Sequence, residues 1–236
     1  MHELVPILGD GERSSVLAYI ASERQLRPEF SVVDVGGSVV GWSAGVANAI
    51  VDINPPRQGE TGGIRYFKAN ISRHDDWQAL DDYTARHGKF DFSICSHTLE
   101  DISNPALVCR KLAAISHGGY IAVPSKFVEM ARFEKRLDSG MYYRGHIHHR
   151  WIFTIRNGEL WGFPKIPFLE VDPFFDQIGR QVTHANRDMS FYWHEDLKLN
   201  IVNDDYLGPN VDAVISYYRE QLIGDDVDAT SGAVYA

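Results

Sequence analysis

The stretch that decides the fold is residues 90–126, which read FDFSICSHTLEDISNPALVCRKLAAISHGGYIAVPSK. Residues 90–96 form a mostly apolar run, which predicts a strand buried on both faces. Residues 105–115 place apolar side chains at helical spacing behind a proline, and a glycine pair follows them. Residues 120–124 are a second apolar run. The order strand, helix, strand predicts one unit of a parallel sheet.

The same alternation extends toward the N-terminus. The elements predicted there are a helix, three strands and a second helix, at residues 12–25, 30–35, 47–53, 64–70 and 77–87. The fold class is therefore α/β, a Rossmann-like, doubly wound and mostly parallel sheet with helices on both faces. Because ligands bind beyond the carboxyl ends of such strands, the residues that follow each strand are the site candidates.

The second half of the chain differs in composition. Of the 28 aromatic residues, 15 lie between Tyr142 and Tyr218. They suit either the core of a β-containing cap or a surface that grips a ligand, and both interpretations stay open. The elements predicted there are a helix, a hairpin with an Asn-Gly turn, a strand pair and a helix, at residues 126–137, 151–163, 189–202 and 211–222.

We expect three segments with different roles. Residues 1–126 are predicted to be the cofactor-binding core, and residues 127–222 the C-terminal strands and cap or acceptor region of the same domain. Residues 223–236 are acidic and then small and polar, which predicts a flexible tail.

Charge and composition exclude several classes of protein. With 23 Lys and Arg against 32 Asp and Glu, the net charge is −9, which disfavours nucleic acid and anionic membranes as partners. No apolar run approaches the roughly 20 residues that span a bilayer, and we expect no signal peptide. Cys95 and Cys109 make no disulfide framework, which favours a reducing, cytoplasmic compartment.

Two further motifs accompany residues 90–126. The run VVDVGG at residues 32–37 ends a predicted strand in Asp34 and a glycine pair, and GGSVVG is not the Gly-x-Gly-x-x-Gly of dinucleotide sites. Asp52 closes the next strand, 18 residues after Asp34. Over residues 30–126 the chain resembles the class I S-adenosylmethionine-dependent methyltransferases, of the type found beside glycan and natural-product genes.

The resemblance implies S-adenosylmethionine as the cofactor. It implies that Asp52 holds the ribose hydroxyls, that Asn70 and Ile71 contact the adenine, and that the glycines let the backbone approach the cofactor. The cofactor-binding residues it implies are Asp34, Gly36, Gly37, Ser38, Asp52, Ile53, Asn70, Ile71, Ser96 and His97. Ordinary turns without a ligand are the less favoured alternative for the glycine pair and for Asp52. Ser38 replaces a usual glycine, and Asp101 a usual histidine.

The segment GHIHHRW at residues 145–151 is the most titratable part of the second half. On an extended chain His146 and His148 face the same way. They suit a proton acceptor for substrate, a metal site completed by a residue such as Asp101, or a polar loop. We favour the first interpretation and assign no metal ligand. The candidates for proton transfer are His97, Asp101, His146 and His148.

The sequence thus predicts an enzyme that transfers a methyl group to an oxygen or nitrogen of a small-molecule or glycan-like acceptor. Two alternatives stay open. Ser38 and Asp101 favour a catalytically silent binding or regulatory protein with the same fold. The HIHH run favours a metal-dependent enzyme of another class.

Overall fold

The computed structural model describes residues 10–56, 62–135, 140–202 and 210–223. The predicted flexible tail therefore lies almost entirely outside the described residues. Within the described ranges, no helix is long and apolar enough to cross a membrane.

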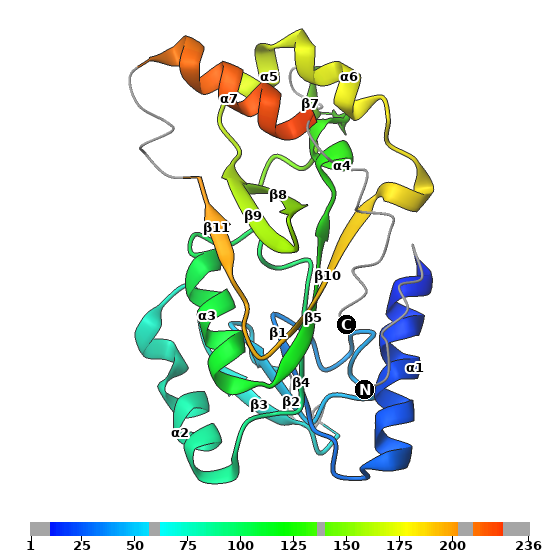
Figure 1. Cartoon of the computed structure of the whole chain (residues 1–236). Helices are drawn as coiled ribbons and strands as arrows, with labels where there is room; N and C mark the ends of the chain where they lie inside the picture. Colours follow the sequence, from blue (N-terminus) through cyan, green and yellow to red (C-terminus); the bar gives the residue numbers. More distant parts are fainter. Residues whose placement is uncertain (1–9, 57–61, 136–139, 203–209, 224–236) are drawn as a thin grey trace.

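A six-stranded sheet forms the centre of the lower half of the molecule (Figure 1). Its order is β10-β5-β4-β1-β2-β3. The strands are β1 (Val32–Val35), β2 (Ala49–Asp52), β3 (Arg65–Lys68), β4 (Phe92–Ser96), β5 (Gly118–Pro124) and β10 (Asp188–His194). The first five are parallel, and β10 runs antiparallel to β5. This confirms the predicted fold class, and the strand order reverses between β1 and β4, which is the switch point of a doubly wound sheet.

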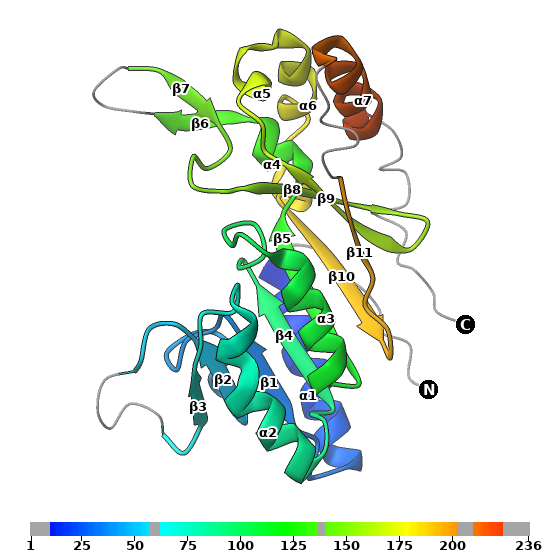
Figure 2. The same cartoon turned by 90° about the vertical axis from the view of Figure 1, so that its left-hand side faces the viewer.

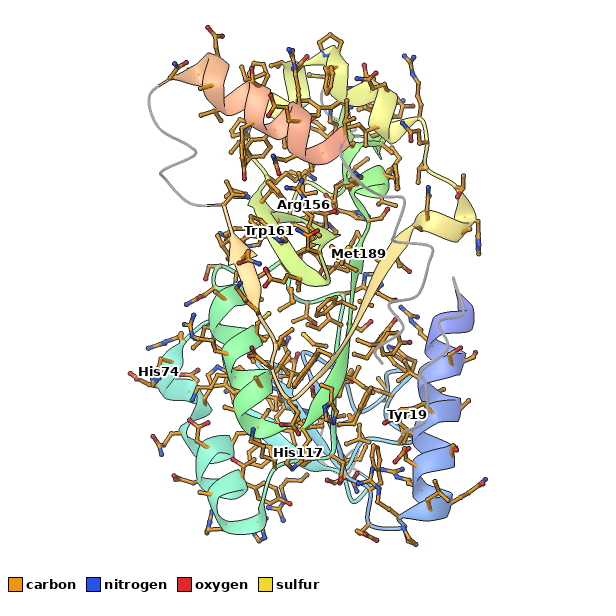
Figure 3. All side chains as sticks on the ribbon, in the orientation of Figure 1. Tyr19, His74, His117, Arg156, Trp161 and Met189 are labelled. Carbon is orange, nitrogen blue, oxygen red and sulfur yellow. The ribbon has the colours of Figure 1, made fainter. Side chains whose placement is uncertain are left out.

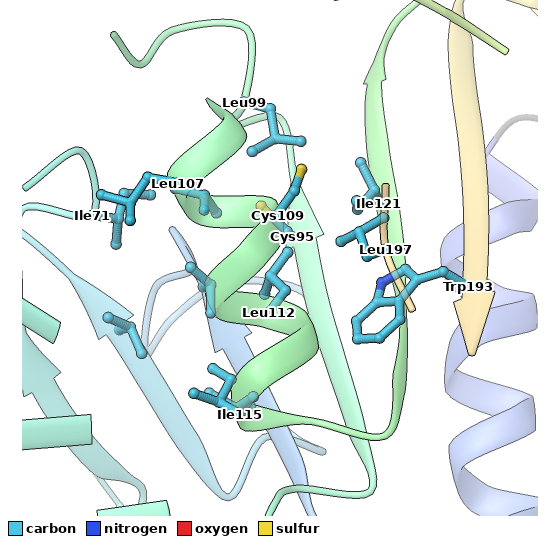
Figure 4. Close-up of a cluster of buried hydrophobic side chains, with 14 of the residues drawn as sticks. Ile71, Cys95, Leu99, Leu107, Cys109, Leu112, Ile115, Ile121, Trp193 and Leu197 are labelled. Carbon is cyan, nitrogen blue, oxygen red and sulfur yellow. The ribbon is translucent and has the colours of Figure 1, made fainter. Parts of the chain in front are cut away.

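Helices cover both faces of this sheet. One face carries α1 (Asp10–Leu26), and the other carries α2 (Gln78–His87), which follows η1 (His74–Trp77), and α3 (Pro105–Ile115) (Figure 1). Asn104 caps α3 by accepting from Leu107 N, and Pro105 opens it, so the sequence itself sets where this helix begins. Leu107, Leu112 and Ile115 then pack with Cys95 and Ile121 of the sheet (Figure 4). Both cysteines are free and buried.

The C-terminal half builds a second layer above the sheet (Figure 2). Its three-stranded sheet has the order β11-β9-β8, and β6 pairs with β7. The strands are β6 (Arg132–Lys135), β7 (Tyr142–Arg144), β8 (Trp151–Arg156), β9 (Glu159–Pro164) and β11 (Leu199–Ile201). The helices are α4 (Lys126–Met130), α5 (Phe168–Val171), η2 (Pro173–Phe175), α6 (Asp176–Gly179), η3 (His184–Asn186) and α7 (Val211–Ile223).

The β8–β9 hairpin separates two hydrophobic cores. Phe153 and Leu160 belong to the core that faces α3, whereas Ile152 and Phe163 belong to the core beneath α4–α7. Arg156 and Trp161 lie close together on this hairpin (Figure 3), with the guanidinium 5.7 Å from the indole centroid. The predicted hairpin is confirmed, and aromatic residues of the second half serve as core.

Two sequence predictions are wrong here. The helix expected over residues 126–137 ends at Met130, because the buried guanidinium of Arg144 donates to the Met130 carbonyl and the chain continues as β6. The strands expected over residues 189–202 form but do not pair with each other beyond one bridge. β10 pairs along its whole length with β5, and β11 pairs with β9. The second half of the chain thus contributes β10 to the main sheet, while the boundary at residue 126 stays a prediction.

Candidate functional site

The turn after β1 holds a buried carboxylate. Asp34 is 3% exposed and accepts a hydrogen bond from the Ser43 hydroxyl. Gly36 follows with a φ of 84°, and its N–H donates to the Val51 carbonyl at 2.8 Å. Burial raises the pKa of Asp34 to about 6, although the hydrogen bond from Ser43 opposes this shift and the charge of Asp52 adds to it.

The two glycines of this turn are required by the protein's own packing. A Cβ atom on Gly37 would overlap the Asp34 carboxylate, and one on Gly36 would overlap the Thr98 side chain. Gly36 also has a positive φ, which side chains disfavour. The tight-turn interpretation therefore explains both glycines, and a bulky variant at Gly37 would disturb Asp34 whether or not a ligand binds.

The residues after β4 face the same turn. His97 has a φ of 49°, and its ring lies between two carboxylates. Nε2 is 3.6 Å from Asp188 Oδ1, and Nδ1 is 3.5 Å from Glu100 Oε1. The adjacent carboxylates of Asp188 and then of Glu100 raise the pKa of His97 to about 9. A raised pKa favours the protonated imidazole, which has no lone pair to accept a proton, and the role of His97 in proton transfer stays a prediction.

Sequence reasoning missed both partners of His97. Glu100 is 1% exposed, and its Oε2 has no hydrogen-bond partner among the described residues. Asp188 begins β10, and its approach to His97 depends on the pairing of β10 with β5, for which the sequence gives no signal.

A cavity of about 180 Å³ lies over the carboxyl ends of β1 and β4. It is lined by Arg13, Asp34, Gly36, Gly37, Ser38, Gly41, Trp42, Ser43, Ser96 and His97. Six of the ten predicted cofactor residues thus come together at the switch point, where the fold places ligands. Arg13 of α1 reaches the cavity with its guanidinium 5.8 Å from the Trp42 ring, and the sequence did not suggest either residue.

Asp52 and Ile53 lie outside the lining of this cavity. Asp52 ends β2, and its Oδ1 accepts a hydrogen bond from Asn54 N at 2.7 Å. That contact is the turn-forming role that the sequence left open, and it leaves the second carboxylate oxygen for another partner. Ile53 follows with an exposed side chain.

Asn70 and Ile71 follow β3, one strand further from the cavity. Asn70 Oδ1 accepts from Ser72 N at 3.1 Å, which closes a local turn. Ile71 is buried in the main core (Figure 4), and its contact with adenine stays a prediction. Its backbone carbonyl is also occupied, because Trp77 Nε1 donates to it at 3.0 Å.

The histidine segment forms a turn rather than the extended chain expected from the sequence. His149 N donates to the His146 carbonyl at 3.2 Å, and this bend gathers three imidazoles. The ring centroids of His148 and His149 are 4.6 Å apart, and those of His146 and His149 are 4.7 Å apart. Burial, followed by the nearby His149, lowers the pKa of His146. The turn thus adds His149, which the sequence analysis did not single out.

Carboxylates from two other segments face these imidazoles. Asp101 Oδ1 is 3.5 Å from His148 Nε2 and 3.7 Å from His149 Nε2. Glu134 Oε2, on β6, is 3.8 Å from His146 Nδ1. Asp101 and His148 therefore do come together, as the sequence suggested for a shared site. The structure adds His149 and Glu134, which form groups with them that could hold a metal ion.

The histidine segment is anchored to the loop that borders the cavity. Arg150 N donates to the Glu100 carbonyl at 2.6 Å, while the Glu100 side chain faces His97. Asp101 is the next residue along that loop. Glu100 therefore connects the cavity at the switch point with the imidazole cluster.

Comparisons with known proteins find similar solved structures, all of low sequence identity. No family model and no curated protein matches the chain. It is similar to a cyclopropane-fatty-acyl-phospholipid synthase-like protein from Lactobacillus casei, with 20% identity over 51% of this chain and 54% of that chain, and a TM-score of 0.31. The chain thus spans about half the length of that protein.

Two further solved structures are similar over more of the chain. The N-terminal domain of EvdMO1, with SAH bound, is 13% identical over 75% of this chain and 65% of that chain, with a TM-score of 0.33. An S-adenosylmethionine-dependent methyltransferase from Mesorhizobium loti is 15% identical over 83% of this chain and 78% of that chain, with a TM-score of 0.34.

Proposed function

We propose that this protein binds S-adenosylmethionine at the switch point of its sheet and transfers the methyl group to an oxygen or nitrogen of a small-molecule or glycan-like acceptor. The observation that carries the proposal is the cavity between the turn after β1 and the loop after β4. It combines the position that doubly wound sheets use for ligands with the residues that the sequence motifs single out.

The charges at the cavity suit the amino-acid end of this cofactor. Arg13 and the cationic His97 both line it, and they offer positive charge to a carboxylate. Ligand sites are usually about 300–1,000 Å³ in volume, so a cavity of about 180 Å³ holds only one part of the cofactor. The remainder would lie over the ends of β2 and β3, toward Asp52 and Asn70.

Asp52 is the residue we assign to the ribose. It ends the strand beside β1, and its carboxylate has a second oxygen besides the one that Asn54 N engages. A carboxylate that accepts from two vicinal hydroxyls makes charge-assisted hydrogen bonds. The turn at Asn54 then fixes the direction of the side chain instead of competing with the ligand.

When bound, the cofactor supplies an electrophilic methyl carbon on a positively charged sulfur. The protein has to align the acceptor and take up the proton that the acceptor's oxygen or nitrogen loses. The raised pKa of His97 favours Asp101, His146 and His148 over His97 as the proton-transfer residues. The net charge of −9 supports a small acceptor over nucleic acid or an anionic membrane.

Calorimetry with S-adenosylhomocysteine tests the binding half of this proposal. We expect saturable binding to the wild-type chain, and about 10–100-fold weaker binding to Asp52→Ala, the loss for hydrogen bonds to a charged group. Asp75→Ala is the matched control, because Asp75 is an exposed aspartate on η1, away from the strand ends. The assignment of Asp52 to the ribose is wrong if the Asp52 and Asp75 variants bind S-adenosylhomocysteine with equal affinity. It is also wrong if the wild type does not bind this ligand.

A catalytically silent binding protein is the second candidate. The observation that favours it is the His97–Glu100–Asp188 group, in which two carboxylates engage the imidazole that lies beside the cavity. Incubation with methyl-labelled cofactor and hydroxylated or aminated small molecules separates the two. Label transfer to any acceptor excludes the silent protein, whereas tight binding without transfer to the whole set favours it.

A further inference from the structure

We propose that Asp101, His148 and His149 form a binding site for one divalent transition-metal ion of the zinc type. The three ligand atoms belong to the loop after β4 and to the turn before β8, and they lie within 4.8 Å of one another. The ion would join the sheet to the C-terminal half at the point where Arg150 N already bonds to the Glu100 carbonyl.

The distances in this group match a metal site better than hydrogen bonds. Asp101 Oδ1 is 3.5 Å and 3.7 Å from the Nε2 atoms of His148 and His149, which is too long for a good hydrogen bond. Around a tetrahedral ion with bonds of about 2.0–2.1 Å, neighbouring ligand atoms lie about 3.4 Å apart. Two of the three distances between ligand atoms are therefore close to that value, and the third is at most 4.8 Å.

A buried carboxylate orients one of the three ligands. His149 is almost fully buried, and its Nδ1 lies 2.5 Å from Glu129 Oε1 on α4, which leaves Nε2 to face Asp101. Lys165 Nζ holds the other oxygen of Glu129 at 2.8 Å. Histidines that ligate metals usually make this kind of contact through their second ring nitrogen. His149, oriented by Glu129, thus has the arrangement that metal-ligating histidines usually show.

The surroundings explain how an ion reaches the site and which ion fits. His148 is 66% exposed and Asp101 43% exposed, so the site is open to solvent on one side. Two imidazoles and one carboxylate suit zinc and similar metals, whereas magnesium and calcium prefer oxygen ligands alone. Glu134 and His146 form a second group that shares His148, and they add negative charge and a spare imidazole beside the ion.

Three protein ligands leave the fourth position of a tetrahedral ion open. Such an ion lowers the pKa of a bound water or hydroxyl group, which is the task that the methyl acceptor sets. This role on the acceptor side rests on the proposed methyl transfer, and it would replace direct proton transfer to Asp101 or His148, whose ligand atoms hold the ion. Metal binding itself does not rest on methyl transfer, because its ligands lie outside the lining of the cavity at the switch point.

Zinc titration of the full chain tests the site. The protein is purified with its affinity tag removed, stripped with a chelator and titrated with zinc chloride by calorimetry. We expect one ion per chain, with affinity at least 10-fold weaker in Asp101→Ala and in His148→Ala. Both side chains are largely exposed, so these variants keep the fold. Glu129→Gln should weaken zinc binding by about 10–100-fold through His149, and circular dichroism checks that this variant is folded.

His74→Ala is the matched control. His74 is exposed at the outer edge of the molecule (Figure 3), and its Nδ1 lies 3.7 Å from Asp75 Oδ1 without a second imidazole. Its zinc affinity should equal that of the wild type within twofold, and excess magnesium should not compete. The proposal is overturned if the wild type binds no zinc stoichiometrically, or if Asp101→Ala and His148→Ala bind as tightly as His74→Ala. Titrating the same samples with S-adenosylhomocysteine shows separately whether the proposed cofactor site holds.

Discussion

Asp34 and His97 face one cavity, and their environments shift both pKa values upward for different reasons. Burial raises the pKa of Asp34 to about 6, whereas two neighbouring carboxylates raise the pKa of His97 to about 9. We therefore propose that His97, which follows β4, offers a positive charge to the ligand. A sequence gives the residue type at this position, but the charge state depends on Asp188, which only the pairing of β10 with β5 brings near.

The charge of His97 makes stability depend on pH. Its folded-state pKa of about 9 lies above the ordinary value of 6.5, so the stabilisation is fully present below pH 6.5 and is lost as pH rises through about 9. Glu100 and Asp188 face the ring, and Arg13 and Arg187 add positive charge near Asp188. NMR titration of the ring protons should give an apparent pKa near 9.

The control for this titration is Asp188→Asn, which removes the largest cause of the shift. The pKa of His97 should then move down toward its ordinary value while Glu100 still holds the ring. Urea unfolding of the wild type should show the matching loss of stability between pH 6.5 and pH 9. A His97 pKa near 6.5 in the wild type would contradict the assigned geometry.

At the scale of elements, the sequence predicted what local patterns determine. Apolar runs bounded by glycine or proline identified the five parallel strands, and the Asn-Gly pair at Asn157 and Gly158 identified the hairpin. Both residues have positive φ, as a two-residue hairpin turn requires. The pairing of β10 and the early end of α4 escaped prediction, because both depend on partners that are distant in sequence.

The β8–β9 hairpin is expected to stabilise both cores. Phe153 and Phe163 are almost fully buried on its two faces, so replacing either with alanine should lower the free energy of unfolding by about 3–5 kcal/mol. Phe133→Ala is the control, because Phe133 is 43% exposed on β6 and should cost much less. Urea unfolding measures all three. A small loss for Phe163→Ala, equal to that for Phe133→Ala, would mean that the upper core contributes little.

At the scale of the whole molecule, the C-terminal half contributes both to the main sheet and to the residues around the cavity. It supplies β10, which covers the edge of β5, and Asp188, which holds His97. It also supplies the imidazoles that meet Asp101. Sequence motifs predicted six of the residues that line the cavity, since these follow strands of the first half. Arg13, Trp42, Glu129 and His149 were missed because folding alone brings them to the two sites.

The central claim is that the cavity over β1 and β4 receives the amino-acid end of S-adenosylmethionine while Asp52 holds its ribose. A crystal structure of the full chain with S-adenosylhomocysteine bound tests it most directly. We predict both ribose hydroxyls within about 3.2 Å of the Asp52 carboxylate, and the homocysteine carboxylate beside Arg13 and His97. A structure in which the ligand lies elsewhere, with Asp52 bonded only to Asn54, would contradict the account.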